Sequence, residues 1–324
     1  MEQEPDRAFV DLAMPFRPAL RVHCYRMLGS VHDSDDVVQE TLLRAWRARD
    51  TLEGPSHVRP WLYRIATNAC LDELRRRPRR VLSSDAYPAA DPNAYPAPPI
   101  EEPVWLEPMP DTWLDGAGEP ESRYALKESV ALAFVAALQF LTPVQRATLL
   151  LRDVVGLSAE ETAEALAISV PAASSALFRA RTTVEEKLVG KSMPSRTEDV
   201  DEALLAQYVG AFESGDIDAL VKLFHDDLTT TMPPRPTWIF GLAANTIFFK
   251  RMTPAWNAPV RIVRTRANGR DALALYRPEP GGAGPYTMRA IEVLEAKDGK
   301  IVRIDHFMTQ EAFRTFDLPE QISG

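Results

Sequence analysis

A proline-rich, acidic stretch in the first half of the chain is the feature that most constrains the fold. Residues 83–122 hold nine of the 27 prolines and nine Asp or Glu, but no Lys or Arg. Proline interrupts helices and central strands, so neither is expected to run through this stretch. We predict an extended, largely polyproline-like linker that separates residues 8–82 from a second block at residues 123–190.

The linker contains a short apolar motif, Trp105–Pro108. Two large apolar side chains, Trp105 and Leu106, stand there in an otherwise polar stretch, which predicts a segment docked on a folded surface. An exposed tryptophan in an unstructured linker is the alternative, because docking must offset the entropy lost when the chain is ordered.

Length and composition are those of a globular protein. The 324 residues are 45% hydrophobic, which indicates two or three domains. Apolar runs such as Val130–Leu141 are shorter than the roughly 18 residues of a membrane span, and the N-terminus lacks a basic signal start. The sequence therefore predicts a cytoplasmic protein without membrane contact. Cys24 and Cys70 are far apart and lack partners for a disulfide framework or zinc site, so we expect buried thiols, no metal and no cofactor.

The net charge of −9 is distributed unevenly. Residues 1–82 carry 14 Lys and Arg against 12 Asp and Glu, and residues 123–196 carry 9 against 7. Residues 197–324 carry 14 against 18. The acidity thus lies mainly in the linker and the C-terminal part, and a nucleic-acid-binding function remains compatible with the two slightly basic blocks.

The first block is predicted to be helical. Asp33 or Ser34 is suited to cap a helix whose core-facing stripe is formed by apolar side chains at helical spacing. That stripe is Val38, Leu42, Ala45 and Trp46, and the opposite face presents Asp36, Gln39, Glu40, Leu43, Arg44 and Arg47.

A second helix is predicted to begin near Pro60 and to lead into the basic run 75–80. Its buried stripe is Leu62, Ile65, Ala66, Ala69 and Cys70, and its outer face presents Tyr63, Arg64, Thr67 and Asn68. An aromatic ring, an amide and arginines suit the binding of unpaired bases, with Trp61 or Tyr63 as a stacking plane. A merely solvated helix face is the alternative.

The block at residues 123–190 is predicted to form four helices. Ser158 and Glu161 form a capping box for one of them. A turn at Ala167–Ser169 then leads into a helix from Val170 to Leu188, with Ser169 as its cap. Two helices joined by a tight turn indicate a helix-turn-helix, although a generic helical hairpin has a similar pattern.

The pattern changes from about residue 199. Amphipathic helices are predicted over 200–212, 216–224 and 241–251, followed by strands over 260–265, 272–276, 286–295 and 300–308. Asp298-Gly299 between the last two strands predicts a tight hairpin. Helices followed by antiparallel strands indicate a separate α+β domain over residues 199–320.

Two motif blocks resemble a known family. Residues 23–30 (HCYRMLGS), 36–46 (DVVQETLLRAW) and 61–68 (WLYRIATN) resemble region 2 of an extracytoplasmic-function (ECF) sigma factor of the sigma-70 class. The stretch from 141–146 (LTPVQR) to Arg181 resembles region 4 of the same family. The resemblance covers nearly all of residues 16–190 and implies an RNA polymerase sigma factor that directs promoter-specific initiation.

The resemblance also implies roles for individual residues. The residues that match the family's core-polymerase-binding surface are Asp36, Gln39, Glu40 and Arg44. Those that match its minus-ten-binding part are Arg59, Trp61, Tyr63, Arg64 and Asn68, next to the loop 53–58. Those that match the reader of the minus-thirty-five element are Ser169, Ser174, Ser175 and Arg179. The helix after Ser169 departs from many relatives, which place basic residues in its middle, because residues 171–176 are small or proline and Arg179 and Arg181 follow downstream of them.

The long linker, its Trp105–Pro108 motif and the C-terminal extension resemble the subgroup that carries a SnoaL-like, polyketide-cyclase-like domain. The resemblance implies a multi-domain chain with two all-α modules and a cone-shaped α+β domain. That domain offers candidate acids and bases, namely His225, Asp226, Asp227, Asp305 and His306, but no spacing among them identifies a reaction. We therefore expect no catalytic residues and a regulatory domain that senses a small ligand or packs on regions 2 and 4.

Three functions from different classes follow from these patterns. They are a promoter-specificity subunit, a cyclase or isomerase with a helical appendage, and a helix-turn-helix repressor. The region 2 block favours the first, because the other two have no use for a face that binds single-stranded DNA.

Overall fold

The computed structural model of the chain describes residues 9–77, 79–101, 105–117, 127–189, 198–252, 259–278, 284–309 and 313–323. The predicted domain boundaries at residues 8, 122, 123 and 190 lie outside these segments. The chain divides into two compact units. An N-terminal unit comprises the first block up to Arg80 and residues 111–189, and a C-terminal unit comprises residues 81–110 and everything after 189.

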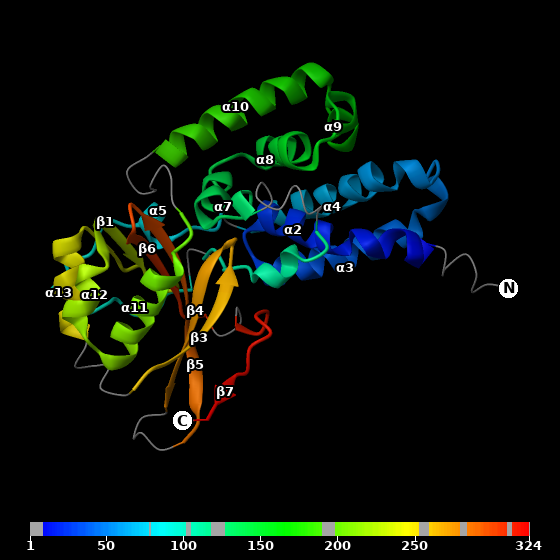
Figure 1. Cartoon of the computed structure of the whole chain (residues 1–324). Helices are drawn as coiled ribbons and strands as arrows, with labels where there is room; N and C mark the ends of the chain where they lie inside the picture. Colours follow the sequence, from blue (N-terminus) through cyan, green and yellow to red (C-terminus); the bar gives the residue numbers. More distant parts are fainter. Residues whose placement is uncertain are drawn as a thin grey trace. The chain divides into compact units, whose positions relative to one another are not determined.

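The first block of the N-terminal unit is helical, as predicted (Figure 1). Its helices are α2 (Arg17–Leu28), α3 (Val31–Arg47) and α4 (Val58–Leu74), with short 3-10 turns at Met14–Phe16, Arg49–Thr51 and Pro55–His57. The cap of α3 is Ser30, whose side chain accepts a hydrogen bond from the Asp33 N–H. The helix thus begins earlier than predicted, because Gly29 ends α2 in a left-handed conformation with φ 69° and turns the chain directly into α3.

The second block of the same unit contains the four predicted helices. They are α7 (Leu132–Leu138), α8 (Pro143–Leu149), α9 (Ala159–Ala165) and α10 (Val170–Val189), with a π-helical segment, η6 (Leu150–Val155), after α8 and a 3-10 turn, η4 (Asp111–Leu114), before them. The predicted Ser158–Glu161 capping box starts α9. In Figure 1 the long helix α10 lies along α7, α8 and α9, which together cover one of its sides.

The two helical blocks share one core. Arg26 of α2 donates hydrogen bonds to the Ser129 hydroxyl at 2.6 Å and to its carbonyl oxygen at 3.2 Å. Arg146 of α8 donates to the carbonyl of Met27 and, at 2.8 Å, to Gln139 Oε1. Burial lowers the pKa of each guanidinium to about 10. A buried cation without hydrogen-bond acceptors is costly. These hydrogen bonds replace part of the hydration that each guanidinium loses on burial, and they thereby link the two blocks.

The C-terminal unit is a mixed sheet covered by helices, in agreement with the predicted α+β class. The strands of its described part form one sheet in the order β2-β1-β6-β5-β4-β3, with β7 paired to β5. They are β1 (Phe224–Thr231), β2 (Trp238–Phe240), β3 (Arg261–Ala267), β4 (Arg270–Pro278), β5 (Tyr286–Lys297), β6 (Lys300–Phe307) and β7 (Gln321–Ile322). Helices α11 (Glu202–Ser214), α12 (Ile217–Lys222) and α13 (Leu242–Met252) lie on one side of the sheet (Figure 1).

The predicted hairpin is present, but three strands of the described part, β1, β2 and β7, were not predicted. Lys297 pairs with Lys300, and Asp298 and Gly299 both have positive φ, as a tight two-residue turn requires. Strand β1 was not predicted because its sequence, FHDDLTTT, is polar and lacks alternation. It pairs in parallel with β6, about 75 residues later in the chain, and such long-range pairing leaves no local signal.

The linker up to Pro110 belongs to the C-terminal unit, and its described residues 111–117 belong to the N-terminal unit. A short helix, α5 (Ser83–Ala86), opens it, and most of the remaining described linker is extended. Trp105 and Leu106 are buried, which confirms the predicted docked segment. The Leu106 N–H donates to the Val81 carbonyl at 3.0 Å, and the Trp105 ring stacks on Tyr87 with 6.3 Å between centroids.

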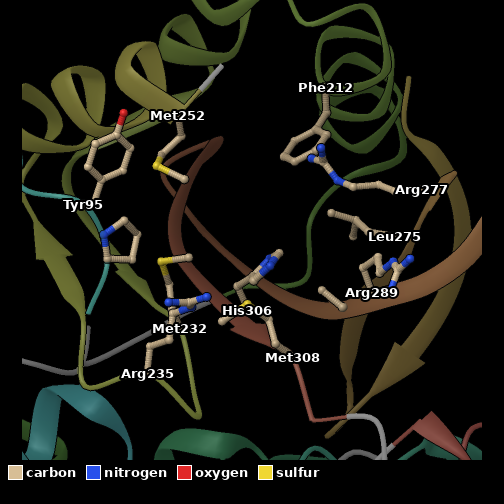
Figure 2. Close-up of a pocket in the computed structure, with 12 residues that line it drawn as sticks. Tyr95, Phe212, Met232, Arg235, Met252, Leu275, Arg277, Arg289, His306 and Met308 are labelled. Atoms are coloured by element: carbon tan, nitrogen blue, oxygen red, sulfur yellow. The ribbon is translucent and has the colours of Figure 1, made fainter. Parts of the chain in front are cut away.

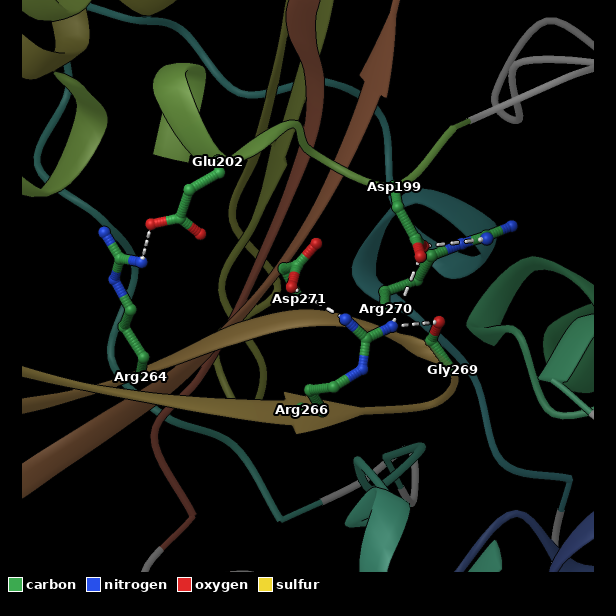
Figure 3. Close-up of polar contacts among 7 residues, drawn as sticks. All are labelled: Asp199, Glu202, Arg264, Arg266, Gly269, Arg270 and Asp271. Carbon is green, nitrogen blue, oxygen red and sulfur yellow. Dashed lines mark hydrogen bonds and ion pairs between the residues drawn. The ribbon is translucent and has the colours of Figure 1, made fainter. Parts of the chain in front are cut away.

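Two segments that enter the C-terminal unit are held by one hairpin, β3–β4. Asn268 at its turn donates its N–H to the Met109 carbonyl at 2.8 Å, and its Oδ1 accepts from the Met109 N–H at 2.9 Å. Arg266 donates to Asp271 at 2.8 Å and lies 3.4 Å from Asp199 (Figure 3). The hairpin thereby anchors both the end of the linker and the start of the segment that leads into α11.

A buried histidine makes the stability of the N-terminal unit depend on pH. His23 of α2 is fully buried and its Nε2 lies 2.9 Å from Thr67 Oγ1 of α4. Burial, assisted by the Arg26 charge, lowers the pKa of His23 from 6.5 to about 3. The unfolded chain therefore binds this proton more tightly than the folded chain, and the free energy of unfolding falls as the pH drops below the unfolded pKa.

We predict that His23→Gln, which keeps a side chain able to hydrogen-bond Thr67, removes this dependence. Between pH 7 and pH 5 the parent should lose about 2 kcal/mol more free energy of unfolding than the variant. Urea unfolding at both pH values measures the difference. His57→Gln, at an exposed position, is the matched control. Equal losses in the parent and in His23→Gln would contradict the assignment.

Candidate functional site

The predicted polymerase-binding residues lie together on α3. Asp36 and Gln39 are exposed, and Glu40 and Arg44 are half-exposed. Arg44 Nε contacts Glu40 Oε1 at 2.8 Å and its NH1 contacts Asp72 Oδ2 of α4 at 3.1 Å. Hydrogen bonds to these two carboxylates raise the pKa of Arg44. The face is thus a patterned set of charges held partly by α4.

Two apolar side chains extend this face. Leu43 and Trp46 have 51% and 40% of their surface exposed. The prediction that Trp46 faces the core is wrong, because Val38, Thr41 and Ala45 form the buried stripe and the next residue projects about 100° further around the helix. The Arg49 guanidinium lies 4.7 Å from the Trp46 ring. An apolar pair among charges is the usual composition of a protein-binding surface.

The polar face of α4 contacts the second block. Arg59 donates to the Val155 carbonyl of η6, and Asn68 Nδ2 donates to the Ala165 carbonyl of α9 at 3.3 Å. Arg64 NH1 forms an ion pair with Glu164 Oε1 at 3.0 Å. The structure therefore brings three predicted DNA-binding residues together, and each of them is engaged by the helix-turn-helix block.

The aromatic residues of α4 are more buried than predicted. Tyr63 meets the His23 ring edge-on with centroids 5.1 Å apart, and burial raises the pKa of Tyr63. Trp61 Nε1 donates to Thr51 Oγ1 at 3.3 Å. The prediction that Tyr63 and Thr67 lie on an outer face is wrong, because packing on both α2 and the second block leaves α4 few wet positions.

A pocket of about 200 Å³ lies beside this contact. It is bounded by the 51–57 loop, by α4 and by α9, and its lining includes Glu53, Trp61, Arg64 and Glu164. The edge of Trp61 and the Arg64–Glu164 pair therefore border the same cavity. Separation of α9 from α4 would widen it into a groove lined by an aromatic ring and a guanidinium, which is the chemistry that holds an unstacked base.

Helix α10 presents its predicted residues to solvent. Ala173, Ala176 and Ala180 are buried, whereas Ser174, Ser175 and Arg179 are exposed. Ser169 Oγ accepts from the Ala172 N–H at 3.3 Å and so serves as the cap. The small buried alanines allow α10 to lie close on α8 and α9, which leaves one continuous side of the helix uncovered.

One exposed residue of α10 was missed by the sequence analysis. Phe178 has 72% of its surface exposed, one turn after Ser174 and Ser175. An exposed aromatic ring at this position was detectable from the i, i+4 spacing from Ser174. Arg181, in contrast, is held by Asp153 of η6 through two contacts of 2.8 and 2.7 Å, so its guanidinium supports the fold of the block.

The C-terminal unit contains a pocket of about 430 Å³ between the sheet, α11 and the linker. Of the five acid and base candidates, all within described segments, His306 lines it. Its Nδ1 lies 2.7 Å from Glu292 Oε1, and Glu292 Oε2 accepts from the Tyr208 hydroxyl at 3.1 Å. Burial, together with the Glu292 charge, raises the pKa of Tyr208 well above its usual value. This series of hydrogen bonds fixes the orientation of an imidazole that lines the pocket.

Of the other candidates, Asp305, His225 and Asp227 have structural partners, and Asp226 is exposed. Asp305 accepts from Arg303 at 2.7 and 2.9 Å and from Thr231 Oγ1 at 2.7 Å, all buried. His225 Nδ1 accepts from the Asp227 N–H at 3.0 Å at the start of β1. Within the described segments, no cluster of three or more His, Cys, Asp or Glu is arranged to hold a metal, and no helix is long and apolar enough to cross a membrane.

Comparison with protein families places three models along the chain. The Sigma-70 region 2 model matches residues 12–80, and the Sigma-70, region 4 model matches residues 131–184. The SnoaL-like domain model matches residues 205–304. The order and positions agree with the resemblance that the motifs carry.

A relative of known class decides the family. The ECF RNA polymerase sigma factor SigG of Mycobacterium tuberculosis is 41% identical over 314 residues, which span 95% of this chain and 83% of SigG. The chain belongs to the family of ECF RNA polymerase sigma factors. SigJ of the same organism is 31% identical over 220 residues, 66% of this chain and 62% of SigJ.

The fold of this sigma factor has a solved counterpart. The crystal structure of Mycobacterium tuberculosis SigJ matches with a TM-score of 0.60 at 21% identity, over 95% of this chain and 99% of that one. This agreement confirms the predicted class of two helical regions followed by a SnoaL-like α+β domain. Family membership also makes the chain a transcription initiation factor. The roles of individual surface residues stay predictions.

Proposed function

We propose that this sigma factor docks on core RNA polymerase through the exposed face of α3 and reads promoter DNA with α4 and α10. As a sigma factor the chain binds the core enzyme and directs initiation at promoters. The observation that carries the surface assignment is the grouping of Asp36, Gln39, Glu40 and Arg44 with exposed Leu43 and Trp46 on one helix. Interfaces of this kind place apolar anchors inside a polar rim.

We further propose that α9 must leave α4 before region 2 captures DNA. Arg59, Arg64 and Asn68 each donate a hydrogen bond to η6 or α9, so a base or phosphate would compete with these segments for the same side chains. The three contacts are few and partly solvent-exposed, so their separation is inexpensive. Binding to core polymerase is the event that would supply this free energy.

We assign the C-terminal unit a regulatory, non-catalytic role. It captures the linker that joins the two DNA-binding regions, through Met109, Trp105 and Leu106. The length of linker that is not held on this unit sets how far regions 2 and 4 can separate. Once one region is bound to its promoter element, that distance sets the effective concentration of the other region at its own element.

The docking surface is tested by Leu43→Ala and by Asp36→Lys. Loss of an apolar anchor at an interface centre costs about 2 kcal/mol, so Leu43→Ala should weaken binding to core polymerase by about 30-fold. Asp36→Lys should weaken it and change its salt dependence. Surface plasmon resonance with immobilised core enzyme measures both. Val10→Ala removes a similarly exposed aliphatic side chain elsewhere in the same block and serves as the control. Unchanged affinity in Leu43→Ala and Asp36→Lys would reject the assignment.

The closure of α4 by α9 is tested by Glu164→Gln, which removes the partner of Arg64. Because an exposed ion pair contributes about 0.2–1 kcal/mol, affinity of the free protein for a single-stranded oligonucleotide should rise by up to about fivefold. Glu185→Gln on α10 makes the same change in net charge at an exposed position. Fluorescence anisotropy compares the two, and equal affinities would show that α9 does not compete with DNA.

The recognition helix is tested within the polymerase complex, because each DNA-binding block carries little net charge and binds duplex DNA weakly alone. The assay is transcription from a promoter library with a randomised upstream element. Ser174→Ala, Ser175→Ala and Phe178→Ala should each change the preferred sequence, with a loss of about 1–3 kcal/mol of discrimination between bases for each lost base contact. Arg179→Ala should weaken all sequences about equally. Glu185→Ala is the control, and unchanged preference in all three base-reading variants would move the reading surface elsewhere.

A further inference from the structure

The pocket of the C-terminal unit combines an apolar wall with basic side chains. Its volume of about 430 Å³ lies within the range of small-molecule sites. The apolar wall is formed by Phe212, Met232, Met252, Leu275, Ala290 and Met308. The polar side chains that line it, apart from the Tyr95 hydroxyl, are all basic: Arg235, Arg277, Arg289 and His306. Among the described residues of the lining there is no carboxylate.

The basic groups converge from neighbouring elements. Figure 2 shows Arg277 of β4 and Arg289 of β5 on one side of the pocket and His306 of β6 between them and Arg235. Burial lowers the pKa of Arg277, which reflects the cost of keeping this guanidinium away from water. Glu292 fixes the His306 ring from behind at 2.7 Å and is itself buried. An anion placed among these groups would offset the cost of their partial desolvation.

The linker forms part of the wall. Tyr95 and Pro96 line the pocket, and Figure 2 shows Tyr95 on the side opposite Arg277 and Arg289. Arg235, a lining residue, donates from NH1 to the Ala97 carbonyl at 2.7 Å, and the Ala97 N–H donates to Thr237 Oγ1 at 2.9 Å. The Tyr95 ring lies 4.4 Å from the Arg251 guanidinium. The site is therefore complete only while the linker is docked.

We propose that this pocket binds a small apolar molecule that carries a carboxylate, and that residues 95–97 of the linker close the site around it. The guanidinium groups suit bidentate recognition of a carboxylate, and the methionines and Phe212 accept an apolar body of variable shape. A guanidinium has five N–H donors, so Arg235 retains its bond to Ala97 while it faces the ligand. This ligand site goes beyond the sigma-factor function, and its test does not use transcription.

Ligand and linker are coupled through this shared wall. A ligand that contacts Tyr95 and Pro96 binds the docked linker more tightly than a released one, so it shifts the linker toward the docked state. By linkage, a change that weakens docking of the linker weakens binding of the ligand, through the same coupling free energy. The proposed ligand therefore controls how much linker is free between the DNA-binding regions.

Calorimetry on the full-length protein tests the ligand class with defined probes. The panel is octanoate, decanoate, benzoate and 2-naphthoate, each paired with the alcohol of the same carbon skeleton. At least one acid should bind with a stoichiometry of one and at least about tenfold more tightly than its alcohol, because a hydrogen bond to a charged group is the stronger one. If no acid binds more tightly than its alcohol, the proposal is wrong.

Variants locate the binding site. Arg277→Gln and Arg289→Gln should each weaken the best acid by about tenfold or more while leaving its alcohol nearly unaffected. Arg314→Gln changes an exposed arginine outside the pocket and should leave both unchanged. Thermal unfolding of each variant shows whether it is folded. If one of the two pocket variants fails to fold, the acid affinity of the other variant tests the assignment. Folded pocket variants that bind the acid like the parent would overturn the assignment.

Hydrogen exchange tests the role of the linker. The amides of Ala97 and Ile100 donate to Thr237 Oγ1 and, at 3.0 Å, to the Pro234 carbonyl, so their exchange reports on docking. The bound acid should slow hydrogen exchange of both amides. Tyr95→Ala should lower the affinity of the protein for the acid. Unchanged or faster exchange at saturation would overturn the coupling, whatever the affinity of the pocket.

Discussion

The buried arginines Arg26 and Arg146 hold the N-terminal unit together. Each belongs to one helical block and donates to acceptors of the other, at Ser129 and at the Met27 carbonyl. Burial of a guanidinium is costly unless acceptors replace its hydration, so separation of the blocks would cost Arg26 its bonds to Ser129 and Arg146 its bond to the Met27 carbonyl. The polar contacts that join α4 to α9 are more exposed, and the two regions also share an apolar core that includes Leu62, Leu138 and Ala165. The polar contacts between the two regions are thus buried near α2 and α8 and more exposed between α4 and α9.

This unequal pairing bears on promoter recognition. Contacts with η6 and α9 engage Arg59, Arg64 and Asn68, the side chains that we propose bind DNA, while the α3 face and the exposed side of α10 are left open. Under the proposed assignment, the polymerase-binding surface is exposed while the single-strand-binding surface is covered. Docking on the polymerase is then the first step that we propose, before capture of promoter DNA.

The C-terminal unit extends the same logic to the linker. Met109, Trp105 and Leu106 are held on this unit, and Tyr95 and Pro96 complete a basic and apolar pocket. A linker that forms part of a binding site differs from a passive tether, because a ligand in that site changes how much of the linker is docked. The His306–Glu292–Tyr208 chain keeps one polar group of the pocket in a fixed orientation, in the manner of a receptor for a particular ligand.

The sequence by itself determined the helical blocks, the helix-turn-helix, four of the strands and the Asp298-Gly299 turn, because periodicity, capping boxes and turn residues act over a few positions. It also determined the family, through two motif blocks in order. Tertiary structure alone decided that Trp46 is exposed and Tyr63 buried, and that β1 is a strand. Those outcomes depend on which helix or strand lies alongside, a partner up to 100 residues away that leaves no mark in the local pattern. For the same reason the basic pocket, assembled from the linker, α11 and strands β4 to β6, was not foreseeable from any one segment.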